Sequence, residues 1–170
     1  MDLIFSGSKL VAEIISFCRD RGMKIAVIES LTGGLLADRF VSVPGASDVF
    51  LGGVVAYQDD LKSYFASVSP SLIQSQTAVD AEVASQMAAG VRQRFATVMN
   101  IKRESLIGIS TTGVAGPEPV GKHPVGEIFI GVSLFGGESV YQFQLEGNRS
   151  EIREQACDKS IHALREQLGL

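Results

Sequence analysis

The segment Glu29-Ser30-Leu31-Thr32-Gly33-Gly34 combines residue types that nucleophilic catalysis uses: a hydroxyl, a carboxylate and glycines. It follows the apolar run at 25–28, and a helical pattern of apolar residues begins directly after it. This order predicts a strand, a tight turn and a helix start, where unpaired backbone N–H groups attract anions and developing oxyanions. Ser30 at such a turn is most often a helix cap, and the alternatives are a nucleophile or a phosphate ligand.

A serine nucleophile needs a general base, and the chain offers lysine or histidine candidates. Lys62 lies one helical turn after the predicted strand 52–57, and a lysine amine acts as a base when burial and neighbouring cations lower its pKa. The alternative for Lys62 is an exposed position on an amphipathic helix. His123 lies in a loop, without an aspartate placed to orient it, and His162 lies in the last helix, where a surface or packing role is favoured.

Further polar groups follow other predicted strands. Tyr57 ends one strand, and Thr112-Gly113 ends another that leads into a loop rich in glycine and proline. Because ligands bind beyond the carboxyl ends of parallel strands, these groups and Ser30 would form one pocket. Arg149 opens the last helix and could hold a phosphate or carboxylate, or be a solvated surface residue.

The remaining chain supplies alternating helices and strands, with a hairpin near the end. This order predicts an α/β layered domain with a mixed sheet over residues 1–170. Ser8 and Gly22 are the expected cap and stop of the first helix. We expect helices at 9–21, 32–41, 59–66, 69–75, 80–99 and 150–167, and strands at 23–28, 52–57, 105–112, 125–134 and 139–145, with the hairpin turn at Gly136-Gly137.

Net charge, cysteine positions and hydropathy argue against several classes of function. The 170 residues carry a net charge of −4, and no run of Lys or Arg appears, which argues against nucleic-acid binding. Cys18 and Cys157 are expected to be buried thiols, and no metal-ligand or dinucleotide-binding spacing occurs, so no metal and no cofactor is expected. The absence of a signal peptide and of a long apolar run predicts a cytoplasmic protein without a membrane partner.

At these residues the sequence resembles the CinA carboxy-terminal domain family, which includes stand-alone nicotinamide-nucleotide amidases. The resemblance covers the chain from about residue 10 to residue 168, and its segments occur in the family's order and approximate spacing. The matching segments are 29–34, Pro44-Gly45-Ala46-Ser47 followed by Phe50 and Gly52-Gly53, Tyr57 with Lys62, 112–117, Pro124-Val125-Gly126 and Gly147-Asn148-Arg149.

The resemblance implies a three-layer α/β/α sandwich and hydrolysis of nicotinamide mononucleotide to nicotinate mononucleotide and ammonia. It implies Ser30 as nucleophile and Lys62 as general base, with Tyr57, Ser47 and Thr112 lining the same site. It also suggests the stand-alone form, a nucleotide as small-molecule partner and a homodimer. The other substrate-binding residues that we expect are Glu29, Thr32, Gly33, Gly34, Gly113 and Arg149.

Two departures from the family pattern support a different hypothesis. Asp59-Asp60 precedes Lys62, and the loop 117–124 lacks the family's run of glycines. These features favour a non-catalytic module that binds a nucleotide or another phosphorylated ligand, of the competence/damage-inducible type. A third hypothesis is a serine hydrolase that uses His123 as its base.

Overall fold

The chain folds around one sheet of five strands in this computed structural model, which describes the backbone of residues 2–170 and the side chains of residues 8–170. The strands are β1 (Lys24–Glu29), β2 (Phe50–Val55), β3 (Leu106–Gly113), β4 (Glu127–Leu134) and β5 (Gly137–Gln144). The helices are α1 (Asp2–Asp20), α2 (Leu35–Val41), α3 (Asp59–Ala66), α4 (Pro70–Gln76), α5 (Ala81–Met99) and α6 (Arg149–Gln167), with 3-10 turns η1 (Ala46–Asp48) and η2 (Arg103–Ser105).

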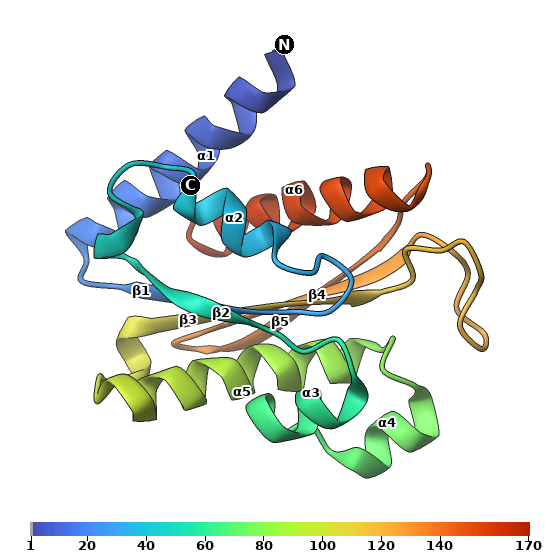
Figure 1. Cartoon of the computed structure of the whole chain (residues 1–170). Coiled ribbons are helices and arrows are strands. Elements are labelled where there is room, and N and C mark those ends of the chain that lie inside the picture. Colours follow the sequence, from blue (N-terminus) through green and yellow to red (C-terminus); the bar gives the residue numbers. More distant parts are fainter. Residues whose placement is uncertain (1) are drawn as a thin grey trace.

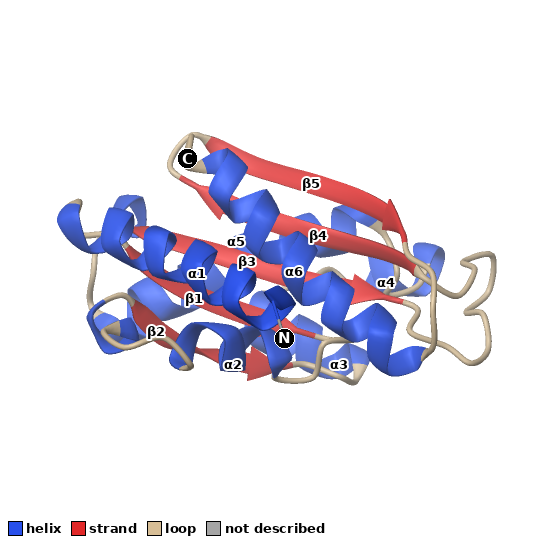
Figure 2. Ribbon diagram, turned by 90° about the horizontal axis from the view of Figure 1, so that it is seen from above, coloured by secondary structure: helices blue, strands red, loops and turns tan. Residues whose placement is uncertain are grey.

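The sheet is mixed and lies between two helical layers. Its strand order is β2-β1-β3-β4-β5, with β2, β1 and β3 parallel and β4 and β5 antiparallel additions. Helices α1, α2 and α6 cover one face, and α3, α4 and α5 cover the other (Figure 1). Figure 2, which looks down on this face, shows α1 and α6 in front of the sheet and running along its strands. The predicted three-layer α/β/α sandwich is confirmed.

The two faces of the central strands have separate cores, because side chains alternate along a strand. Ile25 and Val27 pack in the cluster under α1, α2 and α6, whereas Ala26 and Ile28 pack in the cluster toward α5. Cys18 and Cys157 both lie buried in the first cluster, as expected. Every residue of β1 after Lys24 is buried, as is every residue of β3 before Gly113, so these two neighbouring strands form the centre of the fold.

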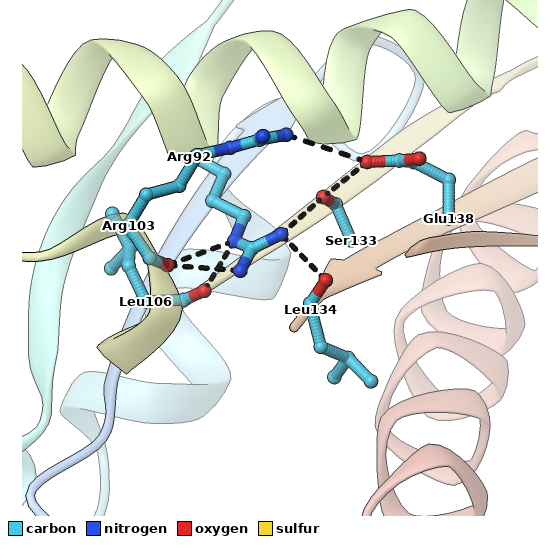
Figure 3. A network of polar contacts seen from close by, with 6 residues as sticks. All are labelled: Arg92, Arg103, Leu106, Ser133, Leu134 and Glu138. Carbon is cyan, nitrogen blue, oxygen red and sulfur yellow. Dashed lines mark hydrogen bonds and ion pairs between the residues drawn. The ribbon is translucent and has the colours of Figure 1, made fainter. Parts of the chain in front are cut away.

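A buried guanidinium ties the amino end of β3 to the β4–β5 hairpin (Figure 3). Arg92 of α5 is 3% exposed and donates to the carbonyl oxygens of Leu106, Arg103 and Leu134, at distances from 2.5 to 3.2 Å. It also donates to the Ser133 hydroxyl at 3.4 Å. Burial and the neighbouring Arg103 lower the pKa of Arg92 from its ordinary value. The network lies at the sheet end opposite the carboxyl ends of the parallel strands.

Two predicted helix starts were wrong. α1 begins at Asp2, so Ser8 lies inside the helix and is not its cap. α2 begins at Leu35, because Gly33 and Gly34 take positive φ values of 59° and 101° and extend the turn that follows β1. Most other predicted boundaries agree within two residues, and Asp80 and Asn148 cap α5 and α6 with their side chains.

Candidate active site

Ser30 lies at the carboxyl ends of the three parallel strands. Its N–H donates to Thr111 O of β3 at 3.0 Å, and on the other side the N–H of Ala56 donates to Glu29 O at 2.8 Å. Alternation along β1 places residue 30 on the face of Ala26 and Ile28, toward α3 and α5. Within the described chain its hydroxyl makes no hydrogen bond, and α2 has no side-chain cap at Gly34. The capping interpretation of Ser30 is therefore wrong.

Glu29 performs the capping that Ser30 does not. Its carboxylate is 1% exposed and accepts the N–H of Gly34 at 2.9 Å, of Leu36 at 3.0 Å and of Ala37 at 2.9 Å. A carboxylate at a helix N-terminus satisfies unpaired donors and interacts favourably with the helix dipole. The expected substrate-binding carboxylate is thus committed to the protein's own backbone.

Among the described residues, the turn between Ser30 and α2 presents three free backbone donors, the N–H groups of Leu31, Thr32 and Gly33. The N–H groups of Thr32 and Gly33 donate no hydrogen bond to any described residue, whereas that of Gly34 is taken by Glu29. The hydroxyl of Thr32 bonds that of Thr111 at 2.7 Å, which ties the turn to β3. Two adjacent N–H groups beside a serine have the chemistry of an oxyanion hole. Gly34, which we expected to share this role, does not.

Lys62 is one of the most deeply buried side chains of the molecule, at 1% exposure. Its Nζ donates to Tyr57 O at 3.2 Å and to Asp59 Oδ1 at 3.1 Å. Since Tyr57 lies two residues after β2, the amine is held at the same sheet edge as Ser30. Lys62 is therefore not the exposed lysine of an amphipathic helix. The Asp59 carboxylate forms an ion pair with this amine.

Arg149 bridges the two sides of this edge. Its Nη2 donates to Tyr57 Oη at 3.0 Å, and its Nη1 donates to Gly116 O at 2.5 Å in the loop after β3. Figure 1 places the start of α6, the start of α3 and this loop together at the right end of the sheet. Tyr57 is 55% exposed, so a ligand can reach its phenol from solvent.

Thr112 and Gly113 lie at the same edge but have structural partners. Thr112 is buried, and its hydroxyl donates to Ala78 O at 2.6 Å, so its proton is not available to a substrate. A Cβ at Gly113 would lie 2.6 Å from Glu127 O, which explains why glycine is needed against β4. The hydroxyl of Thr112 is therefore already used within the protein at the site that we expected this residue to line.

Ser47 is not brought to this edge. It lies in η1, before β2, and the adjacent Asp48 and Val49 contact the first residues of β1 through their carbonyl oxygens. In Figure 1 this turn is at the opposite end of the sheet from the loop after β1. Within one chain, Ser47 therefore cannot line a pocket around Ser30, which corrects the expectation that it does.

His123 has a carboxylate partner that the sequence reading did not identify. Its Nδ1 is 2.7 Å from Glu127 Oε2, the ring is 5% exposed, and it packs edge-on against Phe129. Its Nε2 is buried without a hydrogen-bond partner. No described contact joins His123 to Ser30, so the geometry favours a structural role in the loop.

Arg153 is a site residue that sequence reasoning missed. It lies one turn after Arg149 on α6 and donates to the carbonyl oxygens of Leu31 and Thr32, at 2.9 and 2.8 Å. The signal in the sequence was the spacing of four between two arginines at the start of a helix, which puts both on one face. The sequence did not show what Arg153 contacts, because Leu31 and Thr32 are more than 120 residues away in the chain.

The described residues contain neither a metal-ligand cluster nor a membrane-spanning helix. In the part of the chain that the structure describes, no three His, Cys, Asp or Glu side chains are grouped so as to hold a metal ion. No helix among the described residues is long and apolar enough to cross a bilayer.

Comparison with known proteins gives one consistent family. The family model described as the CinA C-terminal domain matches residues 7–168. A CinA-like protein of Gemmatimonas aurantiaca is 39% identical over 157 residues, which cover 92% of this chain and 35% of that protein. The chain spans between 35% and 38% of the length of the first curated relatives that it matches.

Solved structures share the fold. The crystal structure of a competence-damaged protein (CinA) superfamily protein from Enterobacter cloacae superposes with a TM-score of 0.86 at 24% identity, covering 95% of this chain and 92% of that one. The competence/damage inducible protein CihA from Agrobacterium tumefaciens gives a TM-score of 0.82 at 26% identity, covering 96% of each chain.

Proposed function

We propose that this chain, which belongs to the CinA C-terminal domain family, hydrolyses the carboxamide of nicotinamide mononucleotide to nicotinate mononucleotide and ammonia. The observation that carries the proposal is the placement of an unbonded serine hydroxyl beside two unbonded N–H groups, with a buried lysine at the neighbouring strand end. These are the parts that covalent catalysis of amide hydrolysis needs: a nucleophile, a base and an oxyanion hole.

In this reaction Lys62, as the neutral amine, accepts the proton of Ser30 while Oγ attacks the amide carbon. The N–H groups of Thr32 and Gly33 stabilise the negative charge on the former carbonyl oxygen. Return of the proton from Lys62 to the nitrogen breaks the C–N bond and releases ammonia. Water then hydrolyses the acyl-enzyme, which restores the Ser30 hydroxyl and releases the acid.

The substrate's phosphate would bind Arg149. This guanidinium reaches the site edge from α6 and pairs with no carboxylate among the described residues, so its charge is available to an anion. Tyr57, hydrogen-bonded to Arg149 and partly exposed, would contact the bound nucleotide.

Ammonia release from nicotinamide mononucleotide tests the proposal. Wild type is expected to release ammonia, and Ser30→Ala is expected to lose at least about 1000-fold in kcat, because the covalent route is removed. Ser75→Ala, at an exposed position of α4, is the control and is expected to retain wild-type activity. Unchanged turnover in Ser30→Ala would contradict the nucleophile assignment.

A nucleotide-binding module without turnover is the second candidate, and the Lys62–Asp59 ion pair favours it. The Asp59 carboxylate occupies the amine of Lys62, so this contact must open before Lys62 can act on Ser30. Isothermal calorimetry with nicotinamide mononucleotide separates the two functions: binding heat without ammonia supports the module, and ammonia release supports the amidase.

A further inference from the structure

We propose that Arg153 is the positioning residue that orients the oxyanion-binding N–H groups of Thr32 and Gly33. This inference rests on the proposed amidase function and assigns a role to a side chain that does not touch the reacting atoms. Its basis is a contact between two segments far apart in the sequence, the first turn after β1 and the second turn of α6.

The guanidinium of Arg153 holds two consecutive carbonyl groups. Its Nε donates to Leu31 O at 2.9 Å and its Nη2 donates to Thr32 O at 2.8 Å. Within the described chain Arg153 forms no ion pair, so its charge faces these two oxygens and no carboxylate competes for it. The planar fork of an arginine fixes both oxygens with one rigid group, which a lysine cannot do.

Peptide planarity transmits this constraint to the donors. In a trans peptide the C=O of one residue and the N–H of the next point in opposite directions. Fixing Leu31 O therefore fixes the N–H of Thr32, and fixing Thr32 O fixes the N–H of Gly33. Both N–H groups must point away from the guanidinium, and neither of them has an acceptor in the described chain.

The direction in which they point is the side of the nucleophile. Arg153 comes from α6, which covers one face of the sheet, whereas strand alternation places Ser30 on the face that α3 and α5 cover (Figure 1). The positive charge at the carbonyl ends also polarises the two peptide groups and strengthens their N–H groups as donors. Arg153 thus orients and strengthens the oxyanion hole from behind.

Gly33 makes this contact possible. A Cβ on Gly33 would lie 3.2 Å from Arg153 Nη2, and the residue has a φ of 59°, a conformation that glycine adopts without strain. A side chain at position 33 would therefore push the guanidinium away from the turn. Glycine at this position serves the approach of Arg153 as well as the shape of the turn.

Steady-state kinetics of Arg153→Met, Arg153→Lys and Arg165→Met test the inference. Arg165 is the matched control, because it lies on the same helix and bonds Glu13 on α1. The substrates are nicotinamide mononucleotide and p-nitrophenyl acetate, whose acylation of Ser30 also needs an oxyanion hole. We expect Arg153→Met to lower kcat by about 100-fold for both substrates with KM within threefold, and Arg153→Lys to lower kcat by about tenfold.

The outcomes separate this inference from the proposed function. A kcat within threefold of wild type in Arg153→Met overturns the inference while the amidase function stands. If KM rises as much as kcat falls, or if both follow a lower melting temperature than that of Arg165→Met, the role is structural and the inference is also overturned. If wild type cleaves p-nitrophenyl acetate but not nicotinamide mononucleotide, the proposed nucleotide substrate is refuted. The role of Arg153 is then tested by its effect on ester cleavage. Wild type that cleaves neither substrate overturns both proposals.

Discussion

Replacing Glu29 by glutamine decides whether this carboxylate binds substrate or holds α2 in place. Its Oε2 accepts two N–H groups and its Oε1 accepts a third, so all three bonds are charge-assisted. Glutamine has nearly the same shape but only one acceptor oxygen. If that oxygen takes the position of Oε2, the amide NH₂ faces the N–H of Ala37, and a buried donor loses its partner.

The expected cost follows from these contacts. One buried donor without a partner costs roughly 1–3 kcal/mol, and exchanging a charged for a neutral acceptor weakens the other two bonds. Loss of the charge at the helix N-terminus adds about 0.5–1 kcal/mol. We therefore expect Glu29→Gln to lower the free energy of unfolding by about 3 kcal/mol, which corresponds to a fall of roughly 6–12 °C in melting temperature for a chain of this size.

Urea denaturation followed by circular dichroism measures this change, with Glu118→Gln as control. Glu118 is exposed in the loop after β3, and its substitution is expected to change stability by less than about 0.5 kcal/mol. A loss below about 1 kcal/mol in Glu29→Gln, with an unchanged denaturant slope, would refute the capping argument. A rise in KM without loss of stability would instead support a direct contact with substrate.

Three further predictions concern other parts of the molecule. Asp59→Asn removes the carboxylate that occupies the amine of Lys62, and because Asp59 is exposed we expect a gain of only about fivefold in kcat/KM at neutral pH. Arg92→Met leaves buried carbonyl groups without donors and is expected to lower the unfolding free energy by about 4 kcal/mol in urea denaturation. Burial raises the pKa of Cys18 to about 12 from 9.0 and also raises that of Cys157, so neither thiol should react with iodoacetamide at pH 8 before unfolding.

Controls and pH dependence make these predictions sharper. Asp60→Asn, at an exposed position beside Asp59, is expected to leave activity unchanged, and Arg94→Met, on the exposed side of α5, is expected to cost less than about 1 kcal/mol. The raised thiol pKa of Cys18 contributes stability that is fully present below pH 9 and is lost as pH rises from 9 to 12, because only the unfolded thiol ionises there. Rapid alkylation of the folded protein, or an unchanged rate in Asp59→Asn, would contradict the corresponding argument.

The strand, turn and helix around Ser30 could be predicted because the signals are local: an apolar run, two glycines and a helical apolar pattern. The helix cap was missed because Glu29 belongs to the strand, and its carboxylate reaches forward by five to eight residues. The contact of Arg153 with the turn spans more than 120 residues, and no pattern in one sequence reports such a distance.

Other differences arise from tertiary packing. The sequence placed Lys62 near the correct sheet edge, but only the packing of α3 against α5 explains its burial. Ser47 was assigned to the site by resemblance alone. The residue precedes β2, so it lies at the amino end of that strand, which is the sheet end opposite the site. Asp59 was noted as acidic, whereas its pairing with a lysine three residues later was readable from helical spacing.

The capping box of α6 has a consequence for recombination between relatives. Asn148 and Glu151 fix where the helix begins, and each inserted residue after that point would rotate Arg153 by about 100° around the axis. The turn at residues 135–137 between β4 and β5, by contrast, is exposed and lies beside the amino end of β3, at the sheet end opposite the candidate site. Chimeric domains should therefore tolerate length changes at residues 135–137, while segment junctions placed between residues 148 and 153 should disconnect the helix from the turn it supports.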